Sequence, residues 1–232
     1  MADLAYNRLD NAIGGIRHEV RVVKVAIFGA SGATGRELVS CALARGVAVT
    51  AVAHRHPERL SGIAPAGSVA VVDVANAADV EAELHGHDAV LSALGVGTPL
   101  RPDPRVVSGV RHLVSAMERH GPRRLISLST LGIGSSRAIL SPLQRFFQRF
   151  VIRHEIADHA LKEAAIESSA LEWTIVQAPK LTNGKLTRRY RAGVDIATGS
   201  WMPTLSRADV ADFMLDELAA PRFVRSTVRL LP

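Results

Sequence analysis

Continuous apolar runs alternate along this chain with segments whose apolar residues recur every three or four positions. Val22–Phe28 is a mostly apolar run that ends at a glycine, as expected of a strand buried on both faces. Thr34–Arg45 follows, with Leu38, Val39, Ala42 and Leu43 on one face, which predicts a helix. Further strands are predicted over Val47–Ala53, Val69–Val74, Ala89–Leu94, Leu125–Ser129, Trp173–Val176 and Thr227–Leu231. Further helices are predicted over Asp79–Leu84, Val106–His120, residues 141–168 and Ala208–Leu218.

Strands that alternate with helices imply right-handed crossovers and a parallel sheet covered on both faces. The predicted fold class is therefore α/β, a Rossmann-type, doubly wound and mostly parallel sheet. Residues 1–19 are predicted to be a tail and residues 20–232 a single domain. Ligands of such sheets bind beyond the carboxyl ends of the strands, where the strand order reverses.

The composition is that of an ordinary globular protein, with 47% hydrophobic and 22% charged residues. The net charge of +6 comes from scattered arginines, which favours a solvated basic surface over nucleic-acid binding. Cys41 is the only cysteine, which excludes an intrachain disulfide and a cysteine metal cluster, and it is expected to be a small buried residue. No metal site is predicted. No segment resembles a signal peptide or a membrane span, so we expect a cytoplasmic monomer or homodimer without membrane contact.

A glycine-rich turn, Gly29-Ala30-Ser31-Gly32-Ala33-Thr34-Gly35, links the first predicted strand to the first predicted helix. Gly29 is expected to permit the tight turn, Gly32 to let the backbone approach a pyrophosphate, and Gly35 to let the helix pack close to the strand. The amides of Ala33 and its neighbours at the helix amino terminus attract phosphate, and Ser31 and Thr34 add hydroxyl donors. The position of the turn between a strand and a helix predicts a dinucleotide site.

The loop after the second strand indicates which dinucleotide binds. NAD sites usually carry an Asp or Glu about 20 residues after the turn, where this chain has His54-Arg55-His56-Pro57-Glu58-Arg59. Arg55 is placed to meet a 2′-phosphate, with Arg59 as the second side of a clamp, so NADP(H) is favoured over NAD(H). The alternative is a solvated loop in which Glu58 pairs with a neighbouring arginine. Asp73 and Val74 end the third strand, where Asp73 either contacts the adenine amino group or only stabilises a turn.

These stretches together resemble the atypical short-chain dehydrogenases, in particular the NAD(P)H-binding proteins of the flavin reductase and biliverdin-IXβ reductase type, with the NmrA-like proteins more distant. The resemblance runs from about Val22 to Leu231. It is carried by Gly29–Gly35, His54–Leu60, Asp88–Gly95, Leu125–Thr130, Trp173–Pro179 and Ser206–Ala211.

The resemblance implies a role for several further residues. Leu94 and Gly95 would line the central part of the cofactor, and Ser129 and Thr130 would lie beside the nicotinamide ribose or the substrate. Gln177 stands where many relatives have arginine. The residues that would cover the nicotinamide are Pro179, Lys180 and Leu181.

The chain departs from the family pattern in its catalytic pair. Short-chain dehydrogenases commonly use Tyr-x-x-x-Lys, but neither Tyr6 nor Tyr190 lies in the right helix or precedes such a lysine. With Leu171–Val176 as the anchor of the alignment, Glu155 takes the tyrosine position and His159 the lysine position. At its ordinary pKa of about 6.5, a histidine here would donate a proton near neutral pH. It would otherwise hold the ribose or a substrate carboxylate, or be a structural helix residue.

Residues 135–160 and 179–205 are expected to form the substrate pocket. Residues 135–154 carry Phe146, Phe147 and Phe150 among arginines. An aromatic, basic helix of this kind either grips a planar anionic substrate, packs its apolar face on the sheet, or, least favoured, contacts a membrane.

The predicted function is that of an NADPH-dependent reductase that transfers a hydride to a planar conjugated small molecule, such as a flavin, tetrapyrrole or quinone. The predicted catalytic residues are His159, Thr130 and Ser129. The alternatives are a non-catalytic NADP(H)-binding regulator, as among the NmrA-like proteins, and a biosynthetic tailoring reductase or isomerase. An open pocket with His159 facing it favours the enzyme, whereas a pocket filled by residues 135–154 favours the regulator.

Overall fold

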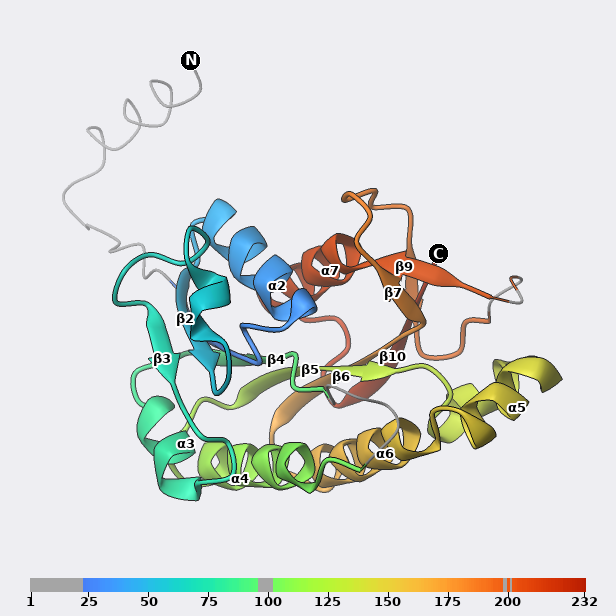
Figure 1. Cartoon of the computed structure of the whole chain (residues 1–232), viewed down its shortest axis with the longest axis horizontal. Coiled ribbons are helices and arrows are strands. Elements are labelled where there is room, and N and C mark those ends of the chain that lie inside the picture. Colours follow the sequence, from blue (N-terminus) through green and yellow to red (C-terminus); the bar gives the residue numbers. More distant parts are fainter. Residues whose placement is uncertain (1–22, 96–101, 198–199, 201) are drawn as a thin grey trace, which may run out of the picture.

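A central eight-stranded sheet with helices on both faces forms the body of the protein (Figure 1). The computed structural model describes residues 23–95, 102–197, 200 and 202–232, so the predicted tail at residues 1–19 lies outside the described residues. The strands of this sheet are β1 (Lys24–Phe28), β2 (Ala48–Ala53), β3 (Val69–Val71), β4 (Ala89–Ser92), β5 (Arg124–Thr130), β6 (Glu172–Ala178), β8 (Arg191–Gly193) and β10 (Ser226–Leu231). Their order is β3-β2-β1-β4-β5-β6-β10-β8, and all neighbours are parallel except β10 and β8. The predicted fold class is confirmed.

Two apolar cores lie on the two faces of this sheet (Figure 1). Helices α2 (Ala33–Ala44) and α7 (Arg207–Ala219) cover one face, and α3 (Ala77–Glu83), α4 (Pro104–His120) and α6 (Arg153–Glu167) cover the other. Ile27 belongs to the first core and its neighbour Phe28 to the second. Because successive strand residues face opposite layers, both must be apolar, which explains the continuous apolar runs of the sequence.

The chain reverses its direction of winding at β1, which is hydrogen-bonded to β2 on one side and to β4 on the other. Phe28 at the carboxyl end of β1 is in register with Val52 of β2 and Ser92 of β4. The loops that follow these three strands therefore emerge together at one edge, called here the carboxyl edge. Such a reversal point leaves a crevice in which ligands of open α/β sheets bind.

Several elements differ from the sequence predictions. The predicted helical stretch over residues 141–168 consists of two helices, α5 (Pro142–Phe150) and α6, and the third strand ends at Val71 rather than Val74. Two short helices, η1 (Pro57–Leu60) and η2 (Gly134–Ile139), and a separate pair of parallel strands, β7 (Lys180–Thr182) and β9 (Thr204–Ser206), were not predicted. Segments of three to six residues are too short for a repeating pattern of apolar residues to predict them. Cys41 is partly buried on α2 rather than fully buried.

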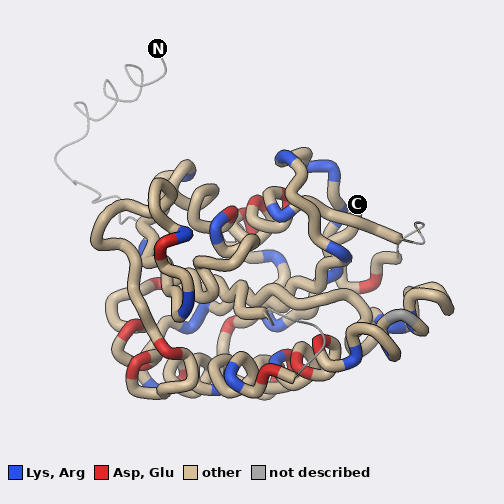
Figure 2. Tube along the Cα trace, viewed as in Figure 1, with Lys and Arg blue, Asp and Glu red and all other residues tan. Residues whose placement is uncertain are grey.

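Basic residues are distributed over many elements, and most of them lie near acidic ones (Figure 2). Helix α5 is an exception, because it carries Arg145 and Arg149 and no acidic residue. None of the described helices is both long enough and apolar enough to cross a bilayer.

Candidate functional site

The glycine turn after β1 has the tight geometry that its sequence predicts. Gly29 has φ +77°, and an added Cβ there would lie 2.8 Å from the Ala93 carbonyl oxygen. A Cβ on Gly35 would meet the backbone of Gly29 and Ala30. A Cβ on Gly32 has one close neighbour, the Gly29 oxygen at 3.1 Å. At Gly29 and Gly35, protein backbone occupies the space that a side chain would need. At Gly32 only the Gly29 oxygen lies near, so a phosphate can approach the backbone there.

The amino terminus of α2 has no side-chain cap. Gly32 is the N-cap residue and offers no side-chain acceptor, and no acidic residue lies in the first turn of the helix. The first-turn amides of Ala33, Thr34 and Gly35 thus lack intrahelical partners, as at every helix start. Amides of this kind at the positive end of a helix dipole bind anions. The turn and the helix start together fit a dinucleotide pyrophosphate.

Hydrogen bonds join the turn to the loop after β2. The Ser31 hydroxyl donates to the Arg55 carbonyl oxygen at 2.7 Å, and Arg36 donates to the Ser31 carbonyl oxygen at 2.7 Å. The Ala30 amide donates to the Val52 carbonyl oxygen at 3.1 Å. Ser31 is therefore a link between the two loops, and its hydroxyl hydrogen is already used within the protein.

Arg55 and Arg59 are exposed beside this link. Neither guanidinium has a hydrogen bond or ion pair with the part of the chain that the structure describes. Glu58 does not pair with an arginine, contrary to the alternative considered above, because the His56 Nδ1 lies 3.0 Å from its Oε1. Both cations thus stay available to a ligand at the end of β2.

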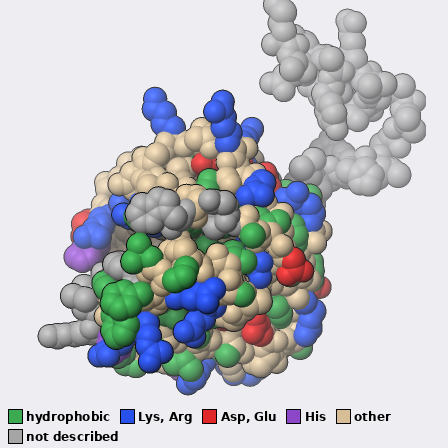
Figure 3. Space-filling model, turned by 90° about the vertical axis from the view of Figure 1, so that its right-hand side faces the viewer, with side chains coloured by type: hydrophobic (Ala, Val, Ile, Leu, Met, Phe, Trp, Pro, Cys, Tyr) green, Lys and Arg blue, Asp and Glu red, His purple; other side chains and the backbone are tan. Residues whose placement is uncertain are grey.

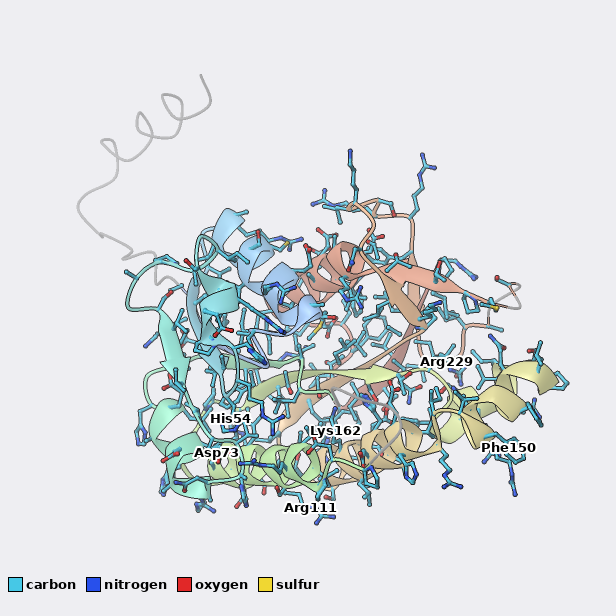
Figure 4. The ribbon with its side chains drawn as sticks, viewed as in Figure 1. His54, Asp73, Arg111, Phe150, Lys162 and Arg229 are labelled. Atoms are coloured by element: carbon cyan, nitrogen blue, oxygen red, sulfur yellow. The ribbon has the colours of Figure 1, made fainter. Side chains whose placement is uncertain are left out.

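Asp73 and Val74 lie after β3 and are engaged with protein neighbours. Asp73 accepts from the Ala75 amide at 3.0 Å and from Arg105 at 2.9 Å. The Ala75 bond is the main cause that lowers the pKa of Asp73. Figure 4 labels Asp73 next to His54, whose Nδ1 is 3.8 Å from Asp73 Oδ1. Asp73 therefore stabilises its own turn, and an adenine contact stays a prediction.

A cavity of about 860 Å³ opens at the carboxyl edge beyond β4, β5 and β6. Its volume is within the range of small-molecule sites. It brings together nine of the predicted residues, namely Thr34, Leu94, Gly95, Ser129, Thr130, His159, Pro179, Lys180 and Leu181. The other predicted residues lie outside its lining, on the segments that follow β1, β2 and β3, including the first turn of α2 and η1. They are Gly29, Ser31, Gly32, Ala33, Gly35, Arg55, Arg59, Asp73 and Val74.

His159 faces this cavity from α6 and is 7% exposed. Its Nδ1 lies 3.2 Å from the Ser129 hydroxyl oxygen at the end of β5. Burial, and then the charge of Lys162, lower the pKa of His159 to about 2. The expectation that this ring titrates near neutral pH is wrong, because the charged form would lose its hydration beside another cation. His159 is a neutral imidazole at physiological pH.

Lys162 lies behind His159, one turn further along α6, and the sequence reading missed it. Its side chain is buried between α6 and the sheet (Figure 4), and the ammonium donates to the Leu94 carbonyl oxygen. Its Nζ is also 3.4 Å from His159 Nδ1. Burial lowers the pKa of Lys162 to about 8, against the opposing effect of Glu163, Asp158 and Glu155. Its spacing of three residues from His159, in a chain with four lysines, is the signal that could have found it.

Gln177 and Glu163 connect β6 to α6 beneath Ser129. The Gln177 amide nitrogen lies 3.0 and 2.9 Å from the two Glu163 carboxylate oxygens. Burial raises the pKa of Glu163, while hydrogen bonds from Ser129 and Gln177 oppose that rise. Gln177 stands where many relatives have arginine. It therefore holds this glutamate with an uncharged amide group. The pair fixes α6, and with it His159, against β6, the strand next to the one that carries Ser129.

Helix α5 borders the opening of the cavity with an apolar surface that has no partner among the described residues. Leu143, Phe146 and Phe150 are 59%, 59% and 62% exposed, and the two phenylalanine rings lie 4.6 Å apart. Leu143 and Phe146 line the cavity. Figure 3 shows hydrophobic side chains gathered beside basic ones at this end of the molecule. The interpretation that the apolar face packs on the sheet is thus wrong for these three residues; the side chain of Phe147 lies outside the described residues.

A family model described as NAD(P)H-binding matches residues 29–221, which include the glycine turn, the cavity and α7. The chain belongs to this NAD(P)H-binding family. The match spans most of the chain and leaves β1 and β10 outside. The match confirms the predicted assignment to NAD(P)H-binding proteins.

Individual relatives are distant in sequence. An uncharacterized chloroplastic protein of Arabidopsis thaliana is 28% identical over 182 residues, which are 73% of this chain and 63% of that protein. Among solved structures, ChuY, an anaerobillin reductase from Escherichia coli O157:H7, has a TM-score of 0.73 at 23% identity, over 90% of this chain and 96% of its own. A short-chain dehydrogenase/reductase from Veillonella parvula in complex with NADP has a TM-score of 0.73 at 19% identity, over 90% and 94% of the two chains. These structures share the fold of this family member.

Proposed function

We propose that this protein is an NADPH-dependent oxidoreductase that reduces a planar, conjugated small molecule. The observation that carries the proposal is the cavity, which joins residues predicted to border the nicotinamide with Ser129, Thr130 and His159. In this proposal NADPH lies along the carboxyl edge, with its pyrophosphate on the amino terminus of α2. The bound cofactor supplies the hydride, and the protein supplies position, polarity and protons.

The preference for NADPH rests on the loop after β2. A 2′-phosphate would meet Arg55, whose guanidinium is exposed and has no described partner, and Arg59 would close the other side. An arginine fork binds phosphate oxygens in a bidentate manner. The residue that directly follows β2 is His54 rather than the acid that an NAD site usually carries there, and Glu58, the only carboxylate of the His54–Arg59 loop, lies 3.0 Å from His56 Nδ1.

The acceptor class follows from the lining of the cavity. Its walls are mostly apolar, with polar groups contributed by several of the elements that line it. Phe146 and Leu143 supply flat and aliphatic surface at the opening, and Lys180 and Arg207 supply positive charge at the border. A flat conjugated molecule, such as a flavin, a quinone or a tetrapyrrole, suits the apolar surface, and the phosphate of a flavin nucleotide or the carboxylates of a tetrapyrrole would also meet the positive charge. ChuY, which shares this fold, is an anaerobillin reductase.

The enzyme is favoured over the non-catalytic regulator because the cavity is open. Residues 135–154 border it rather than fill it, and His159 faces the space. A regulator would have no need of a space of this size beside the predicted nicotinamide position. The tailoring reductase or isomerase has no separate observation in its favour.

The test is NADPH oxidation by the purified full chain against a panel of flavins, quinones and tetrapyrroles. We expect at least one acceptor to be reduced with saturation kinetics, and more efficiently with NADPH than with NADH. Gly32→Val is the matched inactive control, because it removes the proposed phosphate site and leaves the cavity intact. Tight NADPH binding without reduction of any acceptor would favour the regulator instead.

A further inference from the structure

Behind the cavity, three polar groups form a continuous line from β4 to His159. The Leu94 carbonyl oxygen accepts from Lys162, and Lys162 Nζ lies 3.4 Å from His159 Nδ1. Lys162 is 2% exposed and does not line the cavity, whereas His159 does. The lysine can therefore reach a bound molecule only through the imidazole ring.

We propose that Lys162 and His159 form a two-residue proton relay, in which Lys162 gives a proton to His159 Nδ1 as His159 Nε2–H gives one to the acceptor. This inference rests on the proposed reductase function and deepens it.

The proposal requires one tautomer of His159. A lysine ammonium can only donate, so when Lys162 donates to Nδ1 the ring proton lies on Nε2. Ser129 Oγ also lies 3.2 Å from Nδ1, and in this tautomer its hydroxyl is a second donor to the same nitrogen. The imidazole thus presents an N–H group, rather than a lone pair, to the cavity.

The relay accounts for how a neutral imidazole can act as an acid. On its own, the loss of the Nε2 proton would leave an imidazolate, which is very unfavourable. When Lys162 protonates Nδ1 in the same event, the ring stays neutral and passes into its other tautomer. The effective acid is then the lysine, whose pKa is lowered by burial to about 8 and is matched to proton transfer near neutral pH.

The proton and electron balance closes with the cofactor of the proposed function. The acceptor gains a hydride at one atom from NADPH, which is oxidised to NADP⁺, and a proton at a second atom from His159 Nε2. Lys162 becomes a neutral amine, and the relay runs in reverse to recover a proton from cavity water once the product leaves. The net change is one NADPH and one proton consumed for each acceptor reduced by two electrons.

This geometry narrows the acceptor chemistry. A donor N–H at the cavity wall suits an acceptor with an oxygen or nitrogen atom conjugated to the carbon or nitrogen that receives the hydride. Carbonyl and imine groups of flavins, quinones and tetrapyrroles meet that requirement, whereas a hydrocarbon double bond does not.

The charged groups around Lys162 are compatible with this role. Glu163, Asp158 and Glu155 favour the ammonium, and all three lie on α6. From the sheet, β5 presents the Ser129 hydroxyl, and the Leu94 carbonyl follows β4. Asp158 is itself held by the Asp103 amide at 2.8 Å. Lys162 is therefore charged below its pKa of about 8 and loses its proton above it.

The first test is independent of activity. The full chain with ¹⁵N-labelled histidine is followed by NMR, with His159 assigned from the spectrum of His159→Asn. We expect a neutral ring with the proton on Nε2 at pH 7, and a change of its Nδ1 shift as Lys162 titrates near pH 8. Lys162→Met should abolish that change. A proton on Nδ1, or an imidazolium that forms near neutral pH, would overturn the relay.

The second test uses kcat with the reduced acceptor from the panel. In the wild type, kcat should fall about tenfold per pH unit above the Lys162 pKa, because only the ammonium supplies a proton. Lys162→Met should lower kcat by at least about tenfold and remove the alkaline decline, with NADPH affinity retained. Lys24→Met, at an exposed lysine at the start of β1 and outside the cavity lining, should leave both unchanged.

The outcomes separate the two proposals. If the wild type reduces an acceptor and Lys162→Met keeps the same rate and the same alkaline decline, the relay is wrong and the reductase function stands. If the wild type binds NADPH and reduces nothing, the reductase function is wrong and the catalytic role of the relay falls with it.

Discussion

The carboxyl edge of the sheet has two regions that recognise ligands by different means. Around β1–β3, the Gly29–Gly35 turn offers backbone amides, and the exposed guanidinium of Arg55 has no partner among the described residues. Around β4–β6, Ser129, His159 and Lys162 are all buried, and His159 contacts both of the others. The first region gains its interactions when a ligand arrives, and the second holds its groups in place beforehand.

Because of this difference, substitutions in the two regions should change different measured quantities. Exposed cations keep their ordinary hydration until they bind, so changes there should alter affinity. Buried polar groups depend on each other, so changes among them should alter rate, protonation or stability. The following substitutions test that division.

The largest effect is expected from Gly32→Val at the turn. The new side chain would stand where a pyrophosphate must approach the backbone, so NADPH binding should weaken by at least about a hundredfold. Calorimetric titration measures the affinity, and circular dichroism shows whether the domain is folded. Ser40→Val, on an exposed position of the same helix, is the control. A folded Gly32→Val protein that binds NADPH normally would move the phosphate site elsewhere.

His159→Ala tests the second region. We expect kcat to fall about a hundredfold while NADPH affinity changes little, because the ring supplies the proton rather than a cofactor contact. His154→Ala, on the same helix but outside the cavity lining, should keep the wild-type rate. A rise in KM without loss of kcat would make His159 a positioning residue, and Thr130 would be the next to replace.

Gln177→Leu should act on stability. It removes the donor that holds both Glu163 oxygens and leaves a buried carboxyl group short of partners, at a cost of about 1–3 kcal/mol. Urea unfolding measures the loss. The double variant Gln177→Leu with Glu163→Leu should recover part of it, because no buried acceptor is then left unpaired. Equal stability of wild type and single variant would show that Ser129 alone satisfies Glu163.

Arg55→Ala should give the smallest effect and only on cofactor choice. NADPH affinity should fall about tenfold, equivalent to about 1.4 kcal/mol, while NADH affinity stays the same. Arg189→Ala, an exposed arginine on a different loop, is the matched control. Equal loss for both cofactors would mean that Arg55 does not meet the 2′-phosphate.

The two regions also differ in how far the sequence predicts them. The turn is local: a glycine-rich segment of seven residues between an apolar run and an amphipathic helix determines its shape, and Gly29 and Gly35 have the expected geometry. Lys162 escaped notice because its partner Leu94 lies 68 residues away, and only the fold brings them together. The low pKa of His159 escaped notice for the same reason, since burial under β5 has no signal in its own helix.

The position of α5 also could not be predicted from the sequence. The spacing of its phenylalanines predicts an apolar face, and the sequence does not say what that face covers. In the structure Phe146 borders the cavity opening while Phe150 remains exposed. A helix of nine residues that follows a short connection has few neighbours that could settle its position in advance.

Hydride transfer is the central claim, and isotope transfer tests it most directly. NADPH deuterated at C4 of the dihydronicotinamide, one stereoisomer at a time, is mixed anaerobically with the protein and a panel acceptor, and the reduced acceptor is analysed by mass spectrometry. The account predicts deuterium in the product from one stereoisomer only, with an acceptor whose hydride position does not exchange with water, and none with Gly32→Val. Deuterium retained wholly in the cofactor, by a protein that binds NADPH tightly, would contradict it.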